Sequence, residues 1–367
     1  MDARKWRRLV RVGIVVGSLW VPAVAHAAQQ WAVVNSSGAL VRGSAVSATS
    51  LGTGTYQVTF AKNQAACAYV ATSGDTGAGA VSGPIVATVA TRAGNSSALF
   101  IQTWDQSTGA LSSVPFHVAT FCGKMKFAVV DSAGVLARGG HVVSTAHLGA
   151  GSYEVVFDSN VSKCAFTASI GTTGTGSVAN PGQVTVAGRA GNVNGVFVKI
   201  VDRAGTSEDL PFHLGVSCGS KKLIAVINTD GTKARGANVV SSQKLSGANG
   251  GTYEVIFNRN VAGCGYVATI GVTGNGGSVT SPVTITTATR AGNANGVFLF
   301  IHQTNGATID EPFHLFVVCP PVRGSAPAAA DTGAQDAAAR SASPSSASGG
   351  PSNDPRNGPV GKPVGDG

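Results

Sequence analysis

Residues 56–60 read Tyr-Gln-Val-Thr-Phe and residues 253–257 read Tyr-Glu-Val-Ile-Phe, so large apolar residues stand at every second position. A period of two residues is typical of a β-strand that buries one face. The segment 212–218, Phe-His-Leu-Gly-Val-Ser-Cys, has the same period. It puts His213 on the face opposite Cys218, and we expect this histidine to point outward. The three segments predict an antiparallel β-fold.

The segments before these strands carry turn signals. Residues 35–38 read Asn-Ser-Ser-Gly, and residues 131–134 and 228–231 also place Asn or Asp first and Gly fourth. This is the pattern of a type I turn, which here joins two short strands into a hairpin. The chain has 50 glycines and no run of helix formers, which excludes a helical bundle, and glycine lacks the period of three that collagen requires.

The chain contains three copies of one unit of about 97 residues, which we name repeat 1 (28–122), repeat 2 (123–218) and repeat 3 (219–319). A unit of this length is one small domain, because solenoid and propeller units are usually about 20–50 residues long. Three motifs recur with small changes: Ala-Val-Val-Asn at 32–35, 128–131 and 225–228; Arg-Ala-Gly-Asn at 92–95, 189–192 and 290–293; and Pro-Phe-His at 115–117, 211–213 and 312–314.

The strand pattern predicts the fold class. We count about seven strands in each repeat and therefore expect three tandem immunoglobulin-like antiparallel β-sandwich domains, each with one disulfide. A small β-barrel is the alternative, which periodicity leaves open. Only four residues separate Cys122 from Phe127, and Cys218 from Leu223. Because such short connections leave little freedom, we expect the domains to stack end to end as a rod.

The six cysteines follow the repeats, two in each. Spacings of 55, 54 and 55 residues favour pairing within each repeat, although six cysteines allow fifteen pairings. Each bond closes a loop for which chain entropy gives about 4 kcal/mol of stabilisation. No Cys-x-x-Cys pair occurs, which argues against zinc. The predicted disulfides are Cys67–Cys122, Cys164–Cys218 and Cys264–Cys319.

Residues 1–27 have the layout of a secretory signal peptide, with a basic start, an apolar stretch and the cleavage site Ala25-His26-Ala27. We expect cleavage before Ala28, secretion, and no transmembrane segment in the mature protein, since no later segment has the roughly 18 apolar residues that a span needs. The remaining 21 basic and 16 acidic residues give a net charge of +5 over 340 residues. That charge is too dilute to indicate a nucleic-acid partner.

The C-terminal segment 320–367 consists mainly of Ala, Ser, Pro and Gly, with no aromatic residue, Leu, Ile or Cys. Such a segment buries too little apolar surface to offset the entropy of ordering it. We therefore expect a disordered tail.

Catalysis by a repeated unit would require an acid or base in every copy. Gln57 of repeat 1 corresponds to Glu154 and Glu254, and Asp105 and Asp202 have no acidic counterpart in repeat 3. This argues against a repeated carboxylate pair, a Ser-His-Asp arrangement and a repeated calcium site. We therefore predict no catalytic residues, no cofactor and no metal site. An enzyme with its site in one repeat only is kept as an alternative.

Three sets of polar residues recur in every repeat. We expect the histidines to cap neighbouring loops, one set of arginines to pack its stems over an apolar edge with the head groups in water, and the other set to belong to hairpin loops. The functional alternative is a repeated Arg/His surface that binds an anionic glycan or polymer. The sets are His117, His213 and His314; Arg42, Arg138 and Arg235; and Arg92, Arg189 and Arg290.

Sugar binding by stacking would require an aromatic platform in each repeat. After residue 27 the only tryptophans are Trp31 and Trp104, both in repeat 1. Phe127 and Leu223 stand near the position of Trp31 in the other repeats, so we expect the tryptophans in the core. A tryptophan-based carbohydrate array is therefore disfavoured.

The run from Trp31 to Cys122 carries Ala-Val-Val-Asn, Arg-Gly, Tyr-x-Val-x-Phe, Cys-x-Tyr and Pro-Phe-His pieces. It resembles a repeat of uncharacterised secreted bacterial proteins, and the resemblance covers residues 31–319. Since that family has no established activity, the resemblance implies an extracellular or cell-envelope setting and transfers no site.

These observations favour a secreted, non-enzymatic tandem-repeat protein with a structural or adhesive role. A module that binds a cell-surface glycan or a cell-wall polymer is the alternative, and a protein partner also fits the pattern. Because a rod of similar domains presents one face several times, we expect three repeats to bind a repetitive surface more strongly than one repeat does.

Overall fold

The computed structural model describes residues 29–81, 83–245, 250–279 and 281–321, and every regular element among them is a β-strand. The predicted signal peptide, and the predicted tail from residue 322 onward, lie outside the described residues. Repeat 1 contains β1 (Trp31–Val34), β2 (Leu40–Gly43), β3 (Ser47–Gly52), β4 (Thr55–Thr59), β5 (Ala68–Ser73), β6 (Ile85–Arg92), β7 (Asn95–Asp105), β8 (Ala110–Leu111) and β9 (Phe116–Phe121). Repeat 2 contains β10 (Lys126–Val130), β11 (Leu136–Gly140), β12 (Val142–Gly149), β13 (Ser152–Phe157), β14 (Ala165–Thr175), β15 (Gln183–Arg189), β16 (Asn192–Val201) and β17 (Phe212–Ser217). Repeat 3 contains β18 (Leu223–Ile227), β19 (Lys233–Ala237), β20 (Val239–Lys244), β21 (Thr252–Phe257), β22 (Gly265–Asn275), β23 (Val283–Thr289), β24 (Gly296–Gln303) and β25 (Phe313–Val318).

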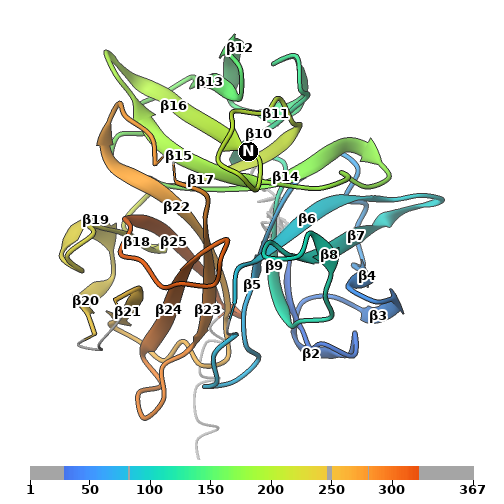
Figure 1. Cartoon of the computed structure of the whole chain (residues 1–367), viewed down its shortest axis with the longest axis vertical. Coiled ribbons are helices and arrows are strands. Elements are labelled where there is room, and N and C mark those ends of the chain that lie inside the picture. Colours follow the sequence, from blue (N-terminus) through green and yellow to red (C-terminus); the bar gives the residue numbers. More distant parts are fainter. Residues whose placement is uncertain (1–28, 82, 246–249, 280, 322–367) are drawn as a thin grey trace, which may run out of the picture. The chain divides into compact units, whose positions relative to one another are not determined.

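The strands of each repeat fall into two antiparallel groups (Figure 1). We name the groups β2-β1-β9-β5, β11-β10-β17-β14 and β19-β18-β25-β22 the inner sheets. The groups β3-β4-β7-β6, β12-β13-β16-β15 and β20-β21-β24-β23 are the outer sheets. Each repeat thus has more strands than the predicted seven, because the segment from Leu40 to Gly52 divides into β2 and β3, which join different sheets.

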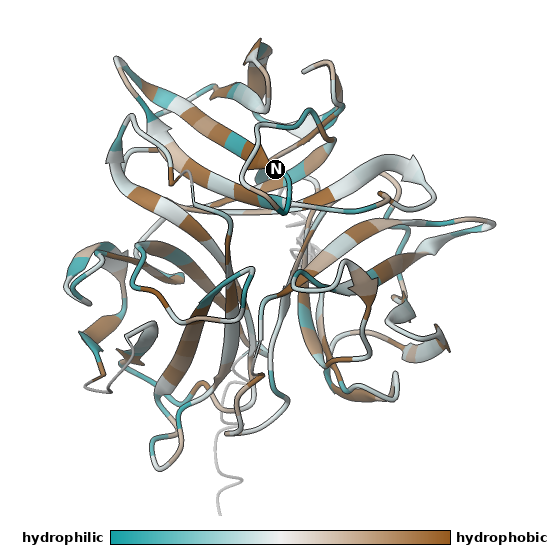
Figure 2. Cartoon of the chain, in the orientation of Figure 1, coloured by the Kyte–Doolittle hydropathy of each residue, from teal (hydrophilic) through white to brown (hydrophobic). Residues whose placement is uncertain are grey.

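The outer sheets follow the predicted alternation. Tyr56 and Val58 of β4 are fully buried in the core of repeat 1, whereas Gln57 and Thr59 are only partly buried. The same pattern recurs in β13 and β21. Bands of hydrophobic and hydrophilic residues also alternate along β16 (Figure 2). One face of each outer sheet therefore covers the core of its own repeat, and the other face is more open.

The inner sheets are buried on both faces except at their edge strands β2, β11 and β19, and every residue of β9, β17 and β25 is buried. One face lies in the core of the repeat, and the other joins a central cluster to which all three repeats contribute. Trp31 and Phe121 of repeat 1, Phe127 of repeat 2 and Phe316 of repeat 3 belong to this central cluster, with the Phe121 and Phe316 rings 5.7 Å apart. The prediction that His213 points outward is therefore wrong, because a second apolar layer covers that face.

The sheets continue from one repeat into the next through parallel pairing. The far end of an inner strand runs beside an outer strand of a neighbour: β14 pairs with β6, and β22 pairs with β15 (Figure 1). A bridge just after β5 forms the third junction, with β23. The paired residues are Gly171 with Val89, Gly271 with Val186, and Gly74 with Thr287.

Glycine is required at these three junctions because the backbones approach closely. A Cβ atom on Gly171 would lie 2.2 Å from the carbonyl oxygen of Val89. A Cβ atom on Gly271 would lie 2.3 Å from the Val186 oxygen, and one on Gly74 would lie 2.4 Å from the Thr287 oxygen. Any larger residue would push the two strands apart.

The three repeats do not form the predicted linear rod. The junctions link repeat 2 to repeat 1, repeat 3 to repeat 2, and repeat 1 to repeat 3, so the contacts close a ring. The described residues up to Pro321 belong to a single compact unit. Short connections do restrict the repeats, but the second apolar face of each inner sheet also has to be covered, and a ring covers all three.

Each disulfide joins the ends of two neighbouring strands of one inner sheet. Cys67 precedes β5 and Cys122 follows β9, whose terminal residues Ala68 and Phe121 are paired. The bond therefore lies within a sheet rather than between two sheets. The three bonds are Cys67–Cys122, Cys164–Cys218 and Cys264–Cys319, the pairing within each repeat that the equal spacings favour.

The predicted turns are present. The Gly38 N–H donates to the Asn35 carbonyl oxygen at 2.9 Å, and β1 and β2 form a hairpin. Gly38 has a φ of +86°, in the left-handed region that favours glycine. Gly94 supplies a positive φ in the β6–β7 hairpin, which is the loop expected around Arg92. Among the described residues, no helix is long and apolar enough to span a membrane.

Candidate functional site

The recurring histidines lie at the contacts between repeats, where each is completely buried. In each case Nε2–H donates to a carbonyl oxygen of the same repeat, and Nδ1 accepts a backbone N–H from another repeat. His117 joins Asp75 O (3.0 Å) to Tyr266 N (2.9 Å), His213 joins Thr172 O (2.9 Å) to Tyr69 N (3.0 Å), and His314 joins Val272 O (3.2 Å) to Phe166 N (3.0 Å). The expectation that the histidines cap loops holds for His117 alone, because Thr172 and Val272 belong to the strands β14 and β22. All three histidines instead hold the ring together.

Burial keeps these histidines neutral. Loss of solvation, helped by a nearby arginine, lowers the pKa of His117, His213 and His314 to about 3. A proton on Nδ1 would meet the incoming backbone N–H, so the cation also loses a hydrogen bond. The imidazoles are therefore not available to bind an anion or to exchange a proton near neutral pH.

The first set of arginines lies beside these histidines and spans the same contacts. The Nε atoms of Arg42, Arg138 and Arg235 donate to the carbonyl oxygens of cysteines in a neighbouring repeat, at 2.7–3.0 Å. Their Nη1 atoms donate to carbonyl oxygens of threonines. Burial lowers the pKa of all three, in Arg235 to about 10. The expectation that their head groups lie in water is wrong, because the neighbouring repeat covers them.

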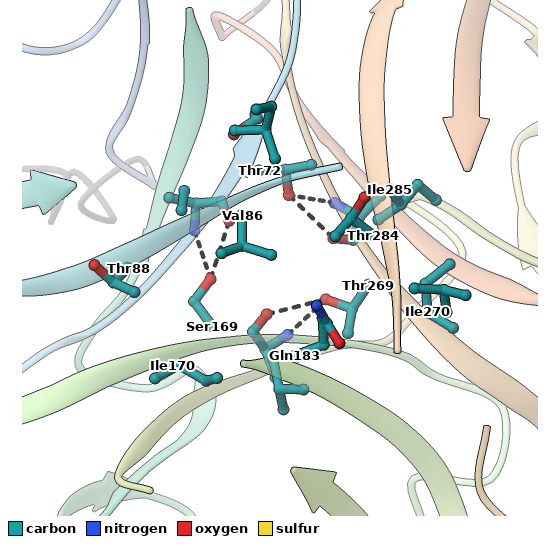
Figure 3. A pocket seen from close by; sticks show the side chains of 18 of the residues that line it. Thr72, Val86, Thr88, Ser169, Ile170, Gln183, Thr269, Ile270, Thr284 and Ile285 are labelled. Carbon is teal, nitrogen blue, oxygen red and sulfur yellow. Dashed lines mark hydrogen bonds between the residues drawn. The ribbon is translucent and has the colours of Figure 1, made fainter. Parts of the chain in front are cut away.

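Three hydroxyl groups complete the contacts between repeats, and sequence reasoning missed them (Figure 3). Each hydroxyl accepts the N–H and donates to the carbonyl oxygen of one buried alanine in another repeat, at 2.8–3.1 Å. The pairs are Ser169 with Ala71, Thr269 with Ala168, and Thr72 with Ala268. Their equivalent positions in the three repeats were the available signal, but Ser and Thr are too common in this chain for that recurrence to stand out.

These hydroxyls line a central cavity of about 60 Å³, room for a few water molecules (Figure 3). Ser73, Gln183 and Thr284 also line it. Ser73 Oγ and Gln183 Oε1 are buried and have no hydrogen-bond partner among the described residues. The cavity is small and has a mixed lining of polar and apolar residues, and its size does not suit a large organic ligand.

The second set of arginines lies on the open faces of the outer sheets. The Nε atom of Arg92 donates to Gln57 Oε1 at 2.9 Å, and that of Arg189 donates to Glu154 Oε1 at 2.9 Å. Arg290 donates in the same way to Glu254. The partners of these arginines are thus Gln57, Glu154 and Glu254, the position that is acidic in repeats 2 and 3 but not in repeat 1.

A phenylalanine accompanies each of these arginine pairs, which sequence reasoning also missed. Phe100 lies directly opposite Gln57, Phe197 opposite Glu154, and Phe298 opposite Glu254 in the strand register. All three are only partly buried. The recurring aromatic residue is a phenylalanine, so the distribution of the tryptophans does not reveal the Phe100 position.

Trp31 is buried in the central cluster, as predicted for the tryptophans. Trp104 is only partly buried, so the prediction holds for one of the two.

Repeat 2 contains a His–Asp pair that bears on the alternative of an enzyme with one site. His147 Nε2 lies 2.8 Å from Asp209 Oδ1, which also accepts from the Gly151 N–H at 2.6 Å and from Tyr153. The Gly151 hydrogen bond is the main cause of the lowered pKa of Asp209. Ser113 and Asp310 bind the corresponding glycines in the other repeats, so this aspartate has a structural role in its loop.

Among the described residues, no group of three or more His, Cys, Asp or Glu lies close enough together to hold a metal ion. Comparisons of the chain with family models, with curated proteins and with solved structures find no match. Among the described residues the chain is all-β and carries three disulfides. Disulfide bonds suit an oxidising compartment.

Proposed function

We propose that this is a secreted, non-enzymatic protein with an adhesive or structural role outside the cell, built from three β-sandwich repeats of the immunoglobulin-like class. The observation that carries the proposal is how the recurring polar residues are used. Two of the three recurring sets form contacts between repeats. They are the three histidines and the arginines Arg42, Arg138 and Arg235. These two recurring sets therefore serve assembly, and the outer sheets are left for contact with a partner.

The proposed location rests on three features together. The first 27 residues have the layout of a signal peptide. Three disulfides suit an oxidising compartment. The resemblance to repeats of secreted bacterial proteins points the same way. N-terminal sequencing of the protein recovered from outside the cytoplasm should begin at Ala28, and an intact Met1 terminus would contradict secretion by cleavage.

The adhesive role is tested with purified protein carrying a fluorescent label. We expect saturable binding to bacterial cells and to their isolated envelopes, and protein unfolded by reduction and alkylation should not bind. Absence of binding to every surface tested would overturn the adhesive role.

The enzyme alternative has a separate test on the His147–Asp209 pair, one of the two His–Asp pairs of repeat 2. His147 corresponds to Ser50 of repeat 1, so His147→Ser is a change that the fold already tolerates at that position. A hydrolytic activity on envelope polymers that this variant abolishes would overturn the non-enzymatic proposal.

A further inference from the structure

The outer sheet of repeat 3 has an open face whose composition differs from that of the other two repeats. Glu254 and Ile256 of β21 and Phe298 and Phe300 of β24 are partly buried on this face, while Tyr253 and the other residues of the opposite face are fully buried. The face lies between the edge strand β20 and the last strand of its sheet, β23.

Two aromatic rings lie next to each other on this face. The ring centroids of Phe298 and Phe300 are 6.2 Å apart. Repeats 1 and 2 have no ring at the position of Phe300, because Gln102 and Lys199 stand there. The chain therefore contains one face with two adjacent phenylalanine rings and two natural versions that lack the second phenylalanine.

A polar pair flanks the two rings. Arg290 reaches across β24 to Glu254 and passes close to Gly296, where a Cβ atom would lie 2.6 Å from the Arg290 Cβ. Only Nε of the guanidinium takes part in this bond. No group among the described residues accepts a hydrogen bond from Nη1 or Nη2 of Arg290. Gln243 donates to the other oxygen of Glu254 at 3.1 Å.

A loop of repeat 1 borders the face on the β23 side. The Thr286 hydroxyl donates to Val81 O at 3.1 Å, and the Thr289 N–H donates to Gly77 O at 2.9 Å. Thr286 lies directly opposite Phe300 in the register. The two rings are thus backed by a neighbouring repeat on one side and lie toward the open edge strand on the other.

We propose that this face of repeat 3, formed by Phe298, Phe300, Arg290 and Glu254, binds a neutral polysaccharide of pyranose sugars. The proposal deepens the adhesive role proposed above and rests on it. The negative faces of aromatic rings attract the polarised C–H groups of a sugar ring. The free Arg290 donors and the Glu254 carboxylate can bind adjacent hydroxyls through charge-assisted hydrogen bonds.

The charges and the rings select the class of sugar. Arg290 is already paired with Glu254, so an acidic polymer would find no free positive charge and would face a carboxylate. Two neighbouring rings suit a chain of pyranoses with equatorial hydroxyls, because such sugars present flat C–H faces in succession. A β-1,4-linked glucan has this geometry.

The test is isothermal titration calorimetry of the purified protein with cellohexaose. An oligogalacturonate serves as the acidic comparison. We expect one cellohexaose site per chain and no binding of the oligogalacturonate. Phe300→Lys, which installs the residue of repeat 2, should weaken cellohexaose binding roughly three- to tenfold, the value of one aromatic contact. The melting temperature should not change, because repeat 2 carries lysine there.

The matched control is the reverse change in repeat 2. Lys199→Phe places a second ring beside Phe197, and Arg189 and Glu154 already flank that ring. This variant should raise the stoichiometry from one cellohexaose to two. A merely structural role for Phe300 would not produce a second site.

The outcomes separate the two proposals. If labelled protein adheres to cells but no neutral oligosaccharide binds, or if Phe300→Lys leaves cellohexaose binding unchanged, this inference is overturned and the adhesive role stands. If cellohexaose binds at this face but no cell surface retains the protein, the adhesive role fails and the sugar site stands.

Discussion

The inner and outer sheets of each repeat are built from similar residues but are under different constraints. An inner strand such as β17 is buried on both faces, and its histidine, His213, bonds to another repeat. An outer strand such as β13 alternates between buried and partly buried residues. The same residues recur in the three inner sheets because each makes the same contact that closes the ring. The outer faces are not under this constraint, and equivalent positions there carry different residues, such as Gln102, Lys199 and Phe300.

The largest expected effect is acid destabilisation of the inner contacts. His117, His213 and His314 have a pKa of about 3 when folded and 6.5 when unfolded. Between these values the unfolded chain binds more protons, so stability is complete above pH 6.5 and is lost as the pH falls toward 3. Three histidines give a slope of at most about 4 kcal/mol per pH unit.

Denaturant unfolding at pH 7.5, 6.0 and 5.0 measures this slope while carboxylates of ordinary pKa remain ionised. A free energy of unfolding that stays constant from pH 7.5 to 5.0 would mean that the buried histidines are not what the inner contacts depend on.

The next effect concerns the close approach of strands from different repeats. Gly171→Val should cost at least about 3 kcal/mol, because its Cβ atom would overlap the Val89 carbonyl oxygen. Gly174 lies on the same strand, and a Cβ atom there would meet nothing within 4 Å. Gly174→Val should therefore stay within about 0.5 kcal/mol of the parent in urea unfolding. Equal losses in the two variants would contradict the parallel junction.

Removing one of the three hydroxyls that line the central cavity should have an intermediate effect on the free energy of unfolding. Thr269→Val keeps the shape of the side chain but leaves the buried N–H and carbonyl oxygen of Ala168 without a partner. We expect a loss of about 2 kcal/mol in the free energy of unfolding. Thr252→Val on the outer face is the comparison, and we expect a loss of no more than about 0.5 kcal/mol there. The ranking would be refuted if the outer variant lost more stability than the inner one.

The smallest effect belongs to an outer ion pair. Arg189 and Glu154 have side chains that are 33% and 21% exposed, so water screens their attraction. Arg189→Met should cost less than about 1 kcal/mol in thermal or urea unfolding. A loss as large as that of Gly171→Val would show that the outer faces are as constrained as the inner ones.

The sequence predicted the strands and turns well where one face of a strand is open to solvent. The alternation of Tyr56, Val58 and Phe60 describes β4 directly, and equal cysteine spacings describe the disulfides. It could not place His213, because a strand buried on both faces also shows a two-residue period. Which of its faces meets another repeat depends on pairing between distant segments, such as Gly171 with Val89.

The candidate residues show the same division. The recurring arginines were visible in the sequence, but their partners were not, since Arg138 bonds to Cys67 O, 71 residues away in another repeat. The Phe100 position escaped notice because its neighbours along the chain are also apolar. Its partial exposure becomes evident only when the strand is placed in its sheet.

The direction of the ring contacts has a consequence for how such a molecule can arise and persist. Every repeat offers the same surface and receives the same surface, as subunits do in a cyclic homotrimer. Three free subunits would separate on dilution, whereas one continuous chain keeps its partners at a fixed local concentration however dilute the surroundings. Linkage also ends the requirement that all subunits be identical. One repeat can then acquire a second aromatic ring while the other two retain lysine and glutamine.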